Sequence, residues 1–412
     1  MSRVIQRGLV LLVFVVPLIF SRVTTEVYGL IKVVVLEVGV LALLGLWLVK
    51  ITNVPRTKDT NISRIAVGPL GWAIFAFFCV AILSLIRASN IHEGVKSIYQ
   101  LGAGVGLFLL IVNNVKEKKG VNEIVLAIVL AGVIASLFSL YENRGIKFGA
   151  LRFAYTSTFG NPIFFAQYIS LAIPISVAMC LQKNSVRHYL SRVFFGLSAS
   201  FMLVFLLLTR SRGAYLGVAV AFLYCYIVLL LHCSKKLRKV LIGVLIACLI
   251  ASSVGLMCLP QLKGLVGENI RFRNLIRVYL WGSTFRMVKD HPILGVGAGN
   301  FKVIYPLYRS AKVRETIPKG VKYSKAHNDF LQIWAEMGTL GLICFLWILF
   351  SLAPRVLYPL PERTGPSAHI SLGLSAGIIA LLVQAFFNPL LYVPASGMGF
   401  WTLLGLIALE GR

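Results

Sequence analysis

Residues 121–141 read VNEIVLAIVLAGVIASLFSLY and carry no charged side chain after Glu123. A helix that crosses the hydrocarbon core of a bilayer needs about 20 predominantly apolar residues, since each adds about 1.5 Å of length. This segment meets that requirement, and similar segments recur along the chain. Of the 412 residues, 58% are hydrophobic and 13% are charged, whereas about a quarter are charged in a soluble domain. The sequence therefore predicts an all-α membrane protein.

We expect about twelve transmembrane helices in a single polytopic membrane domain that comprises residues 1–412. The predicted spans are residues 4–21, 30–49, 67–87, 97–113, 121–141, 162–181, 193–208, 213–232, 240–259, 328–352, 367–387 and 396–410.

Positive residues gather in alternate loops between these spans. Lys235, Lys236, Arg238 and Lys239, for example, separate spans eight and nine. Because Lys and Arg accumulate in cytoplasmic loops, the pattern predicts that both termini are cytoplasmic. The same rule accounts for much of the formal net charge of +27. We therefore expect membrane lipids around the protein and no nucleic-acid partner.

Residues 261–327 form a large loop between spans nine and ten, which the alternation places on the outer, periplasmic side. We expect this loop to contain short helices. It holds thirteen Lys and Arg but three Asp and Glu, and loops of this length are exempt from the orientation rule. Clustered cations outside the membrane suit a phosphate or pyrophosphate ligand. Attraction to anionic lipid headgroups is the alternative.

His327, Asn328 and Asp329 stand where the loop enters span ten. Short polar side chains cap helix N-termini, so His327 is expected at the boundary of water and membrane, where it could act as a base near neutral pH. The alternative is that it merely helps to cap the helix. Glu336 lies nine residues further on, about 13 Å deeper along a continuous helix. It is a functional candidate or one half of a buried structural ion pair.

Arginines occupy two further places near the outer edge. Arg210 and Arg212 share the short turn between spans seven and eight, and Arg277 precedes Trp281 by four residues in the large loop. A guanidinium group donates two parallel hydrogen bonds to phosphate. Snorkelling toward lipid headgroups is the alternative for the turn arginines. On a helix, Arg277 and Trp281 would share a face.

Gly295, Gly297 and Gly299 form a Gly-x-Gly-x-Gly pattern in the same loop. A nucleotide-binding loop would need a preceding strand and a following Lys-Ser or Lys-Thr pair, and neither is present; the predicted loop also faces away from cytosolic nucleotide. The pattern instead favours a tight turn that links two interfacial helices.

Five motifs, taken in order, resemble the O-antigen ligase family of bacterial envelope glycosyltransferases, which also contains O-antigen polymerases and protein O-oligosaccharyltransferases. They are Phe159-Gly160-Asn161-Pro162, Thr209-Arg210-Ser211-Arg212-Gly213, Arg277-x-x-x-Trp281, Asp290-His291-Pro292-Ile293-Leu294-Gly295-Val296-Gly297, and Ala326-His327-Asn328-Asp329-Phe330 followed by Glu336-Met337-Gly338. The resemblance runs from about residue 155 to residue 345.

The resemblance implies a GT-C-like arrangement of the helices. It also implies transfer of a glycan from undecaprenyl pyrophosphate to an acceptor hydroxyl, on the periplasmic side of the bacterial inner membrane. Arg212 and Arg277 match the pyrophosphate-binding arginines of the family, with Arg210 as a neighbour that could share the task. His327 matches its catalytic histidine. Asp329 or Glu336 could orient that histidine.

No cofactor or metal is expected, because the sequence has no Asp-x-Asp motif or cluster of carboxylates that would hold Mg²⁺. The acceptor is the lipid A core in a ligase, or the growing glycan in a polymerase. We favour the ligase and keep the polymerase as the alternative. A polysaccharide or lipid transporter is the alternative from another class, although internal repeats and broken helices typical of transporters are not evident.

Overall fold

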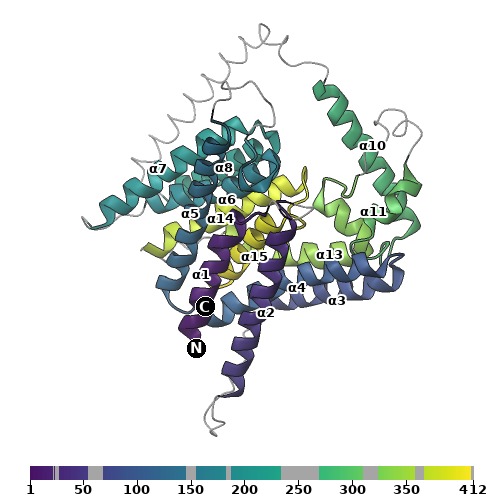
Figure 1. Ribbon diagram of the computed structural model, residues 1–412, viewed down its shortest axis with the longest axis horizontal. Helices are drawn as coiled ribbons and strands as arrows, with labels where there is room; N and C mark the ends of the chain where they lie inside the picture. The colour runs from purple at the N-terminus through teal and green to yellow at the C-terminus, as the bar shows by residue number, and fades with distance from the viewer. Residues whose placement is uncertain are drawn as a thin grey trace.

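The computed structural model describes residues 1–21, 23, 27–53, 68–144, 155–181, 187–232, 269–309, 323–357 and 366–409. Within these ranges the regular structure is helical throughout (Figure 1). The elements are α1 Ser2–Leu18, α2 Leu30–Thr52, α3 Pro69–Ser84, η1 Leu85–Arg87, α4 Ile91–Asn114, α5 Lys118–Glu142, η2 Ser157–Phe159, α6 Pro162–Cys180, α7 Arg187–Leu208, α8 Arg212–His232, α10 Asn269–Asp290, α11 Phe301–Ile304, η4 Tyr305–Tyr308, α13 Asp329–Leu357, α14 Pro366–Ala385 and α15 Pro394–Leu409.

Eight segments in the described ranges are long and apolar enough to cross a membrane. They are Leu30–Thr52, Pro69–Arg87, Ile91–Asn114, Lys118–Glu142, Pro162–Cys180, Tyr189–Leu208, Arg212–Leu231 and Asp329–Leu357. The protein is therefore a multi-pass α-helical membrane protein. The predicted spans at the two ends of the chain coincide with shorter helices, α1, α14 and α15. The predicted span 240–259 lies outside the described residues, so the expected number of twelve stays a prediction.

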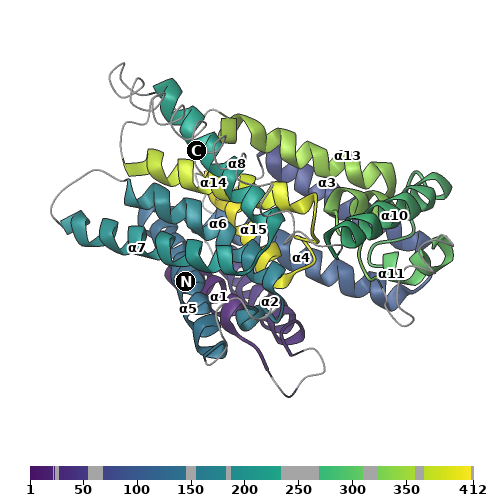
Figure 2. The ribbon, with the colours of Figure 1, turned by 90° about the horizontal axis from the view of Figure 1, so that it is seen from above.

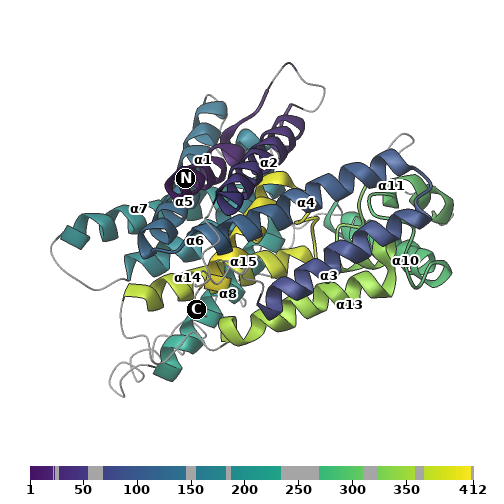
Figure 3. The ribbon, with the colours of Figure 1, turned by 90° about the horizontal axis from the view of Figure 1, so that it is seen from below.

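Burial separates the central helices from the peripheral ones. Helices α6 and α15 are buried along nearly their whole length, and Figures 2 and 3 show them at the centre of the bundle beside α14. Peripheral helices instead expose large apolar side chains, such as Leu41 and Leu48 of α2 and Leu207 of α7. Exposed leucines of this kind suit contact with lipid tails, because apolar side chains are more favourable in hydrocarbon than in water.

Helix α10 and the short helices α11 and η4 lie together at one end of the molecule, beside one end of α3, α4 and α13 (Figures 1 and 2). They pack through a separate apolar cluster that includes Leu280, Met287 and Phe301. We predicted short helices in the large loop, whereas α10 has 22 residues. The part of the loop that is described, residues 269–309 and 323–327, is thus mostly a helical layer packed on the bundle.

Span ten contains a break that the sequence did not predict. Helix α13 is broken at Gly338, which has φ of +66°, so the break lies two residues after Glu336. The backbone of residues 292–296 enters the break. Val296 N donates to Ala335 O at 2.9 Å, and Thr339 N donates to Pro292 O at 2.7 Å. These bonds supply partners for backbone groups that the break would otherwise leave unsatisfied.

Glycine is needed on both sides of this contact. A Cβ on Gly338 would lie 2.1 Å from Ile293 O, and one on Gly295, whose φ is +66°, would lie 2.5 Å from Ala335 O. The two backbones could not approach so closely with larger residues. The predicted tight turn between α10 and α11 is therefore observed, and it also packs into the break of α13.

Candidate active site

The turn between α7 and α8 presents two arginines to a cavity of about 420 Å³. Arg210 has a left-handed φ of +53°, which is uncommon for a residue with a side chain. The turn is held by Thr209 Oγ1, which donates to Leu206 O at 2.6 Å. Arg212 is the first residue of α8. Both side chains are exposed and line the cavity, so a ligand can reach them.

Helix α10 contributes the third arginine from another side of the cavity. Arg277 lines it and donates from Nη2 to Asn388 Oδ1 at 3.5 Å. Burial, and then the nearby positive charge of Arg212, lower the pKa of the Arg277 guanidinium. No lining residue in the described part of the chain is a carboxylate. Guanidinium groups that gather on the wall of one cavity favour an anionic ligand.

His327 lines the same cavity as the three arginines. Its backbone is left-handed, with φ of +53°, and its ring lies edge-on to Tyr323 with 6.2 Å between centroids. Burial, with a smaller contribution from the charge of Arg277, lowers the pKa of His327 to about 4. The imidazole is therefore neutral at physiological pH and able to accept a proton.

Hydrogen bonds fix the chain on both sides of His327. Ala326 N donates to Gln332 Oε1 at 2.6 Å, and Trp281 Nε1 donates to Ala326 O at 3.0 Å. Asn328 Oδ1 accepts from Leu331 N at 3.0 Å, so the expected N-cap of span ten is present. The left-handed backbone of His327 is strained. Such strain persists where surrounding contacts hold the backbone in place, and it clusters at functional sites.

Asp329 connects α13 to the segment before α15. Its Oδ2 accepts from Leu390 N at 2.8 Å and from Leu391 N at 3.1 Å. Leu390 and Leu391 follow closely after Asn388, which contacts Arg277. Asp329 therefore holds the 388–391 segment against the start of α13, and among the described contacts it makes no hydrogen bond with His327.

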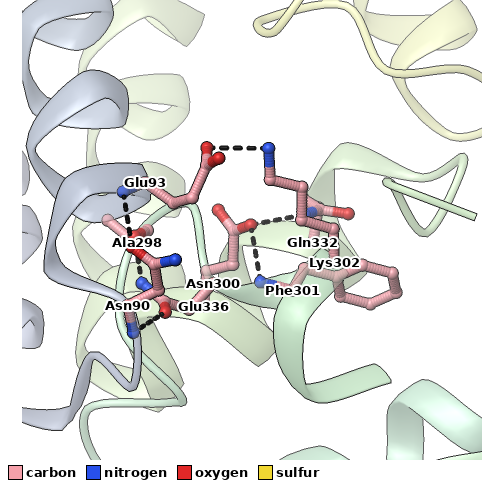
Figure 4. Close-up of polar contacts among 8 residues, drawn as sticks. All are labelled: Asn90, Glu93, Ala298, Asn300, Phe301, Lys302, Gln332 and Glu336. Carbon is pink, nitrogen blue, oxygen red and sulfur yellow. Dashed lines mark hydrogen bonds and ion pairs between the residues drawn. The ribbon is translucent and has the colours of Figure 1, made fainter. Parts of the chain in front are cut away.

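Glu336 is 1% exposed and accepts three hydrogen bonds from neutral donors. Phe301 N and Gln332 Nε2 donate to Oε1 at 3.3 and 2.7 Å, and Tyr392 OH donates to Oε2 at 2.8 Å. Figure 4 shows the first two of these bonds. The described contacts of Glu336 include no salt bridge, although its negative charge partly offsets the lowering of the pKa of the nearby Lys325 by burial. Glu336 instead ties the loop, α13 and the 388–393 segment together.

Trp281 and Asn161 both support neighbouring backbone. Trp281 lies one turn after Arg277 on α10, so the predicted shared face is present, with Arg277 at the cavity and Trp281 at Ala326. Asn161 caps α6, because its Oδ1 accepts from Ile163 N at 2.8 Å. Its side chain belongs to an adjacent cavity, which His327 also lines.

Sequence reasoning missed the segment between α14 and α15. Asn388 lines the cavity that contains Arg210, Arg212 and Arg277, which we call the arginine cavity. Tyr392 lines the adjacent cavity. The available signal was the Asn388-Pro389 pair between two apolar spans, since Asn-Pro marks turns. The pair resembles Asn161-Pro162 at the start of α6. In the described residues, no three His, Cys, Asp or Glu side chains gather as a metal site would require.

A comparison with protein-family models matches residues 197–346 to the O-antigen ligase family. The match contains Arg210, Arg212, Arg277 and His327, the four residues that converge on the cavity. No curated protein matches the chain. The matched segment runs from α7 to the middle of α13 and includes the two turns in left-handed conformation. Over residues 197–346, this chain is similar to the O-antigen ligase family.

Proposed function

We propose that the protein transfers a glycan from undecaprenyl pyrophosphate to an acceptor hydroxyl, as an O-antigen ligase that joins O-antigen to the lipid A core. The match of residues 197–346 to this family supports a ligase or polymerase type of glycosyltransferase. The observation that carries the proposal is the convergence of Arg210, Arg212, Arg277 and His327 on one cavity whose described lining has no carboxylate.

The arginines would bind the pyrophosphate and stabilise its developing charge. The bond between the anomeric carbon and the phosphate oxygen breaks, and its electron pair leaves with undecaprenyl pyrophosphate, which gains one negative charge. Preorganised cations stabilise such a leaving group without reorganising at the moment of reaction. Arg210 and Arg212 approach from the α7–α8 turn and Arg277 from α10, so the anion would be held from two directions.

His327 would act as the general base. The acceptor oxygen forms the new bond to the anomeric carbon, and its proton moves to a ring nitrogen of His327, which becomes imidazolium and later releases the proton to water. A pKa of about 4 in the free protein keeps the ring unprotonated. Bound pyrophosphate adds negative charge next to the arginines, which raises the pKa of His327 and strengthens it as a base. A single in-line displacement inverts the anomeric configuration.

Localisation is part of the same proposal. We infer a bacterial inner membrane protein with both termini in the cytoplasm and the active site on the periplasmic side, where the lipid tail of the donor can stay among membrane lipids. The exposed leucines of the peripheral helices support contact with those lipids. The alternation of Lys and Arg between loops supports the orientation.

The direct test is glycan transfer by the purified full-length protein in detergent, with a lipid-pyrophosphate-linked glycan as donor. We expect activity in the wild type, loss of activity in His327→Ala, and retention in His92→Ala, a matched control at an exposed position in the first turn of α4. Transfer in detergent, where no gradient exists, also excludes transport as the main activity. Full activity in His327→Ala would refute the assigned base.

A deletion strain separates the ligase from the polymerase. A ligase defect leaves long lipid-linked glycans that are not attached to lipopolysaccharide. A polymerase defect leaves single repeat units on both carriers. Single units would replace the ligase assignment with the polymerase one, while the chemistry of the arginine cavity would stay the same.

A further inference from the structure

A second cavity of about 610 Å³ adjoins the arginine cavity, and His327 lines both. The other shared boundary is the start of α6, where Asn161 lines the second cavity and Pro162 the first. The two cavities therefore meet at the side chain that we assign as base. This arrangement leaves one side of the imidazole for the donor and the other side for a second substrate.

Lysines predominate among the charged residues on the described lining of the second cavity, which we call the lysine cavity. Its lining includes Lys32, Lys96, Lys302 and Lys325, with Glu93 as the described carboxylate. Glu93 Oε2 pairs with Lys302 Nζ at 2.7 Å, and Figure 4 shows the two side chains facing one another. One acidic group thus pairs with one of four lysines, and three further lysines remain on the described lining.

Two of these lysines lie over aromatic rings. Lys325 Nζ lies 3.5 Å from the centroid of the Tyr392 ring, and burial lowers the pKa of its ammonium group. Lys32 is 2% exposed, donates to Val16 O and Pro17 O, and lies 5.0 Å from the Phe159 ring centroid. Capping the end of α1 accounts for the contacts of Lys32, but not for the lysines opposite it.

Other lining groups suit a sugar. Gln100, Ser97 and Ser324 offer amide and hydroxyl groups to sugar hydroxyls, and Tyr28 and Tyr392 offer aromatic rings. Pockets that combine apolar surface with a few convergent polar groups fix the orientation of small ligands. Lysine is suited to phosphate as a point charge, whereas the arginines of the first cavity suit bidentate pyrophosphate recognition. The two cavities therefore differ in the anion that they favour.

We propose that the lysine cavity is the acceptor subsite, and that it binds a sugar that carries a phosphate or carboxylate group beside the hydroxyl to be glycosylated. The proposal rests on the proposed function, because His327 takes the acceptor proton. The lysines would hold the charged substituent at the far side of the cavity, and the free hydroxyl would face His327. A neutral sugar would lack the contact that places it.

The test is binding of sugar probes to the full-length protein in neutral-lipid nanodiscs, measured by saturation-transfer NMR. Glucose 6-phosphate and glucuronate should bind more tightly than glucose. Lys96→Gln should weaken glucose 6-phosphate binding about fivefold, and Glu93→Gln should tighten it by a similar factor, since each changes the lining by one charge of opposite sign. Lys96 and Glu93 lie at the open rim, so neither change disturbs the core.

Two controls assign the binding to the lysine cavity. Lys289→Gln changes an exposed charge on α10 that lines neither cavity, and it should leave the affinity unchanged. Arg210→Gln, in the other cavity, tests whether the probe binds to the arginines instead. Loss of glucose 6-phosphate binding in Arg210→Gln, with no response to Lys96→Gln, would place the probe on the arginines and overturn the proposal.

Two further outcomes would overturn it as well. One is the absence of saturable binding of either acidic sugar. The other is full displacement of the acidic sugars by phosphatidylglycerol added to the nanodiscs, which would make the cavity a lipid-headgroup site. The proposed function has a separate test, which is glycan transfer by the wild type and its loss in His327→Ala. If the wild type transfers glycan but the substitutions of Lys96 and Glu93 do not change the affinity for glucose 6-phosphate, the acceptor subsite alone is refuted.

Discussion

The indole Nε1 of Trp281 donates a hydrogen bond of 3.0 Å to the carbonyl of Ala326, the residue before His327. Arg277 lies one turn earlier on the same helix and lines the cavity beside His327. One helix, α10, therefore sets the position of both an arginine and the proposed base. A shift of α10 would move the two groups together.

Trp281→Phe should lower kcat about fivefold, because the ring stays and one hydrogen bond of about 1 kcal/mol that positions His327 is lost. KM for the lipid donor should change little, since no contact with the donor is removed. Trp334→Phe is the matched control. It removes an exposed indole hydrogen bond to Thr339 and should leave kcat unchanged. Equal kcat in Trp281→Phe and wild type would show that this bond does not position the base.

Arg277→Lys should reduce kcat/KM about a hundredfold, because a point charge lacks the guanidinium fork that binds pyrophosphate at two oxygens. Arg286→Lys, on the same helix but outside the cavity, serves as the control. Initial rates across donor concentrations provide the measurement. If Arg277→Lys retains full activity, Arg277 acts as a general cation and its geometry is unimportant.

The neutral form of His327 should dominate down to about pH 4, because burial and the charge of Arg277 lower its pKa to about that value. Below that pH the ring is protonated and cannot accept a proton, so kcat/KM should fall as pH decreases through the pKa. Diethyl pyrocarbonate labelling of the His327 peptide, followed by mass spectrometry, reports the neutral fraction. Arg277→Gln and added inorganic pyrophosphate should each shift the labelling midpoint to higher pH. An unchanged midpoint in both cases would mean that these charges do not reach His327.

Gly338→Ala should destabilise the protein by about 1–3 kcal/mol, since it forces a side chain into a left-handed backbone, and its Cβ would lie 2.1 Å from Ile293 O. Gly45→Ala is the control. Gly45 is in the middle of α2 with open space around it, so alanine should be neutral or stabilising there. Thermal unfolding in detergent distinguishes the two. A Gly338→Ala protein as stable as wild type would show that the break in α13 can relax.

Removal of metal ions should leave transfer unchanged, because the arginines supply the positive charge that the leaving group requires. The check is initial rate after dialysis against EDTA, compared with the rate after Mg²⁺ is added back. A loss of activity that Mg²⁺ restores would show that the donor is bound with a divalent cation.

Local properties of the chain predicted the helices well. Segment 121–141 lies within α5 Lys118–Glu142, and segment 162–181 nearly coincides with α6 Pro162–Cys180. A helix that spans a membrane satisfies its own backbone hydrogen bonds, so its length and apolarity can be read from contiguous sequence. Asn328 and Asn161 were similarly readable, because a cap acts on the next turn of the same helix.

The break in α13 could not be read in this way. Gly338 was visible in the sequence, but glycine is common inside transmembrane helices. The break depends on the backbone of residues 292–296, which is far away along the chain and supplies the missing hydrogen bonds. The role of Glu336 changed for the same reason, because its donors Phe301 and Tyr392 come from other segments.

The sequence by itself determined that this protein is a helical membrane protein, and it identified Arg210, Arg212, Arg277 and His327 as candidates, because apolar length and short motifs are local. Only the tertiary structure decided that these four residues line one cavity, that Asn388 contacts Arg277, and that His327 also borders a lysine cavity. These relationships join the α7–α8 turn, α10, α13 and the segment before α15. Their proximity results from how the helices pack, and no local pattern encodes it.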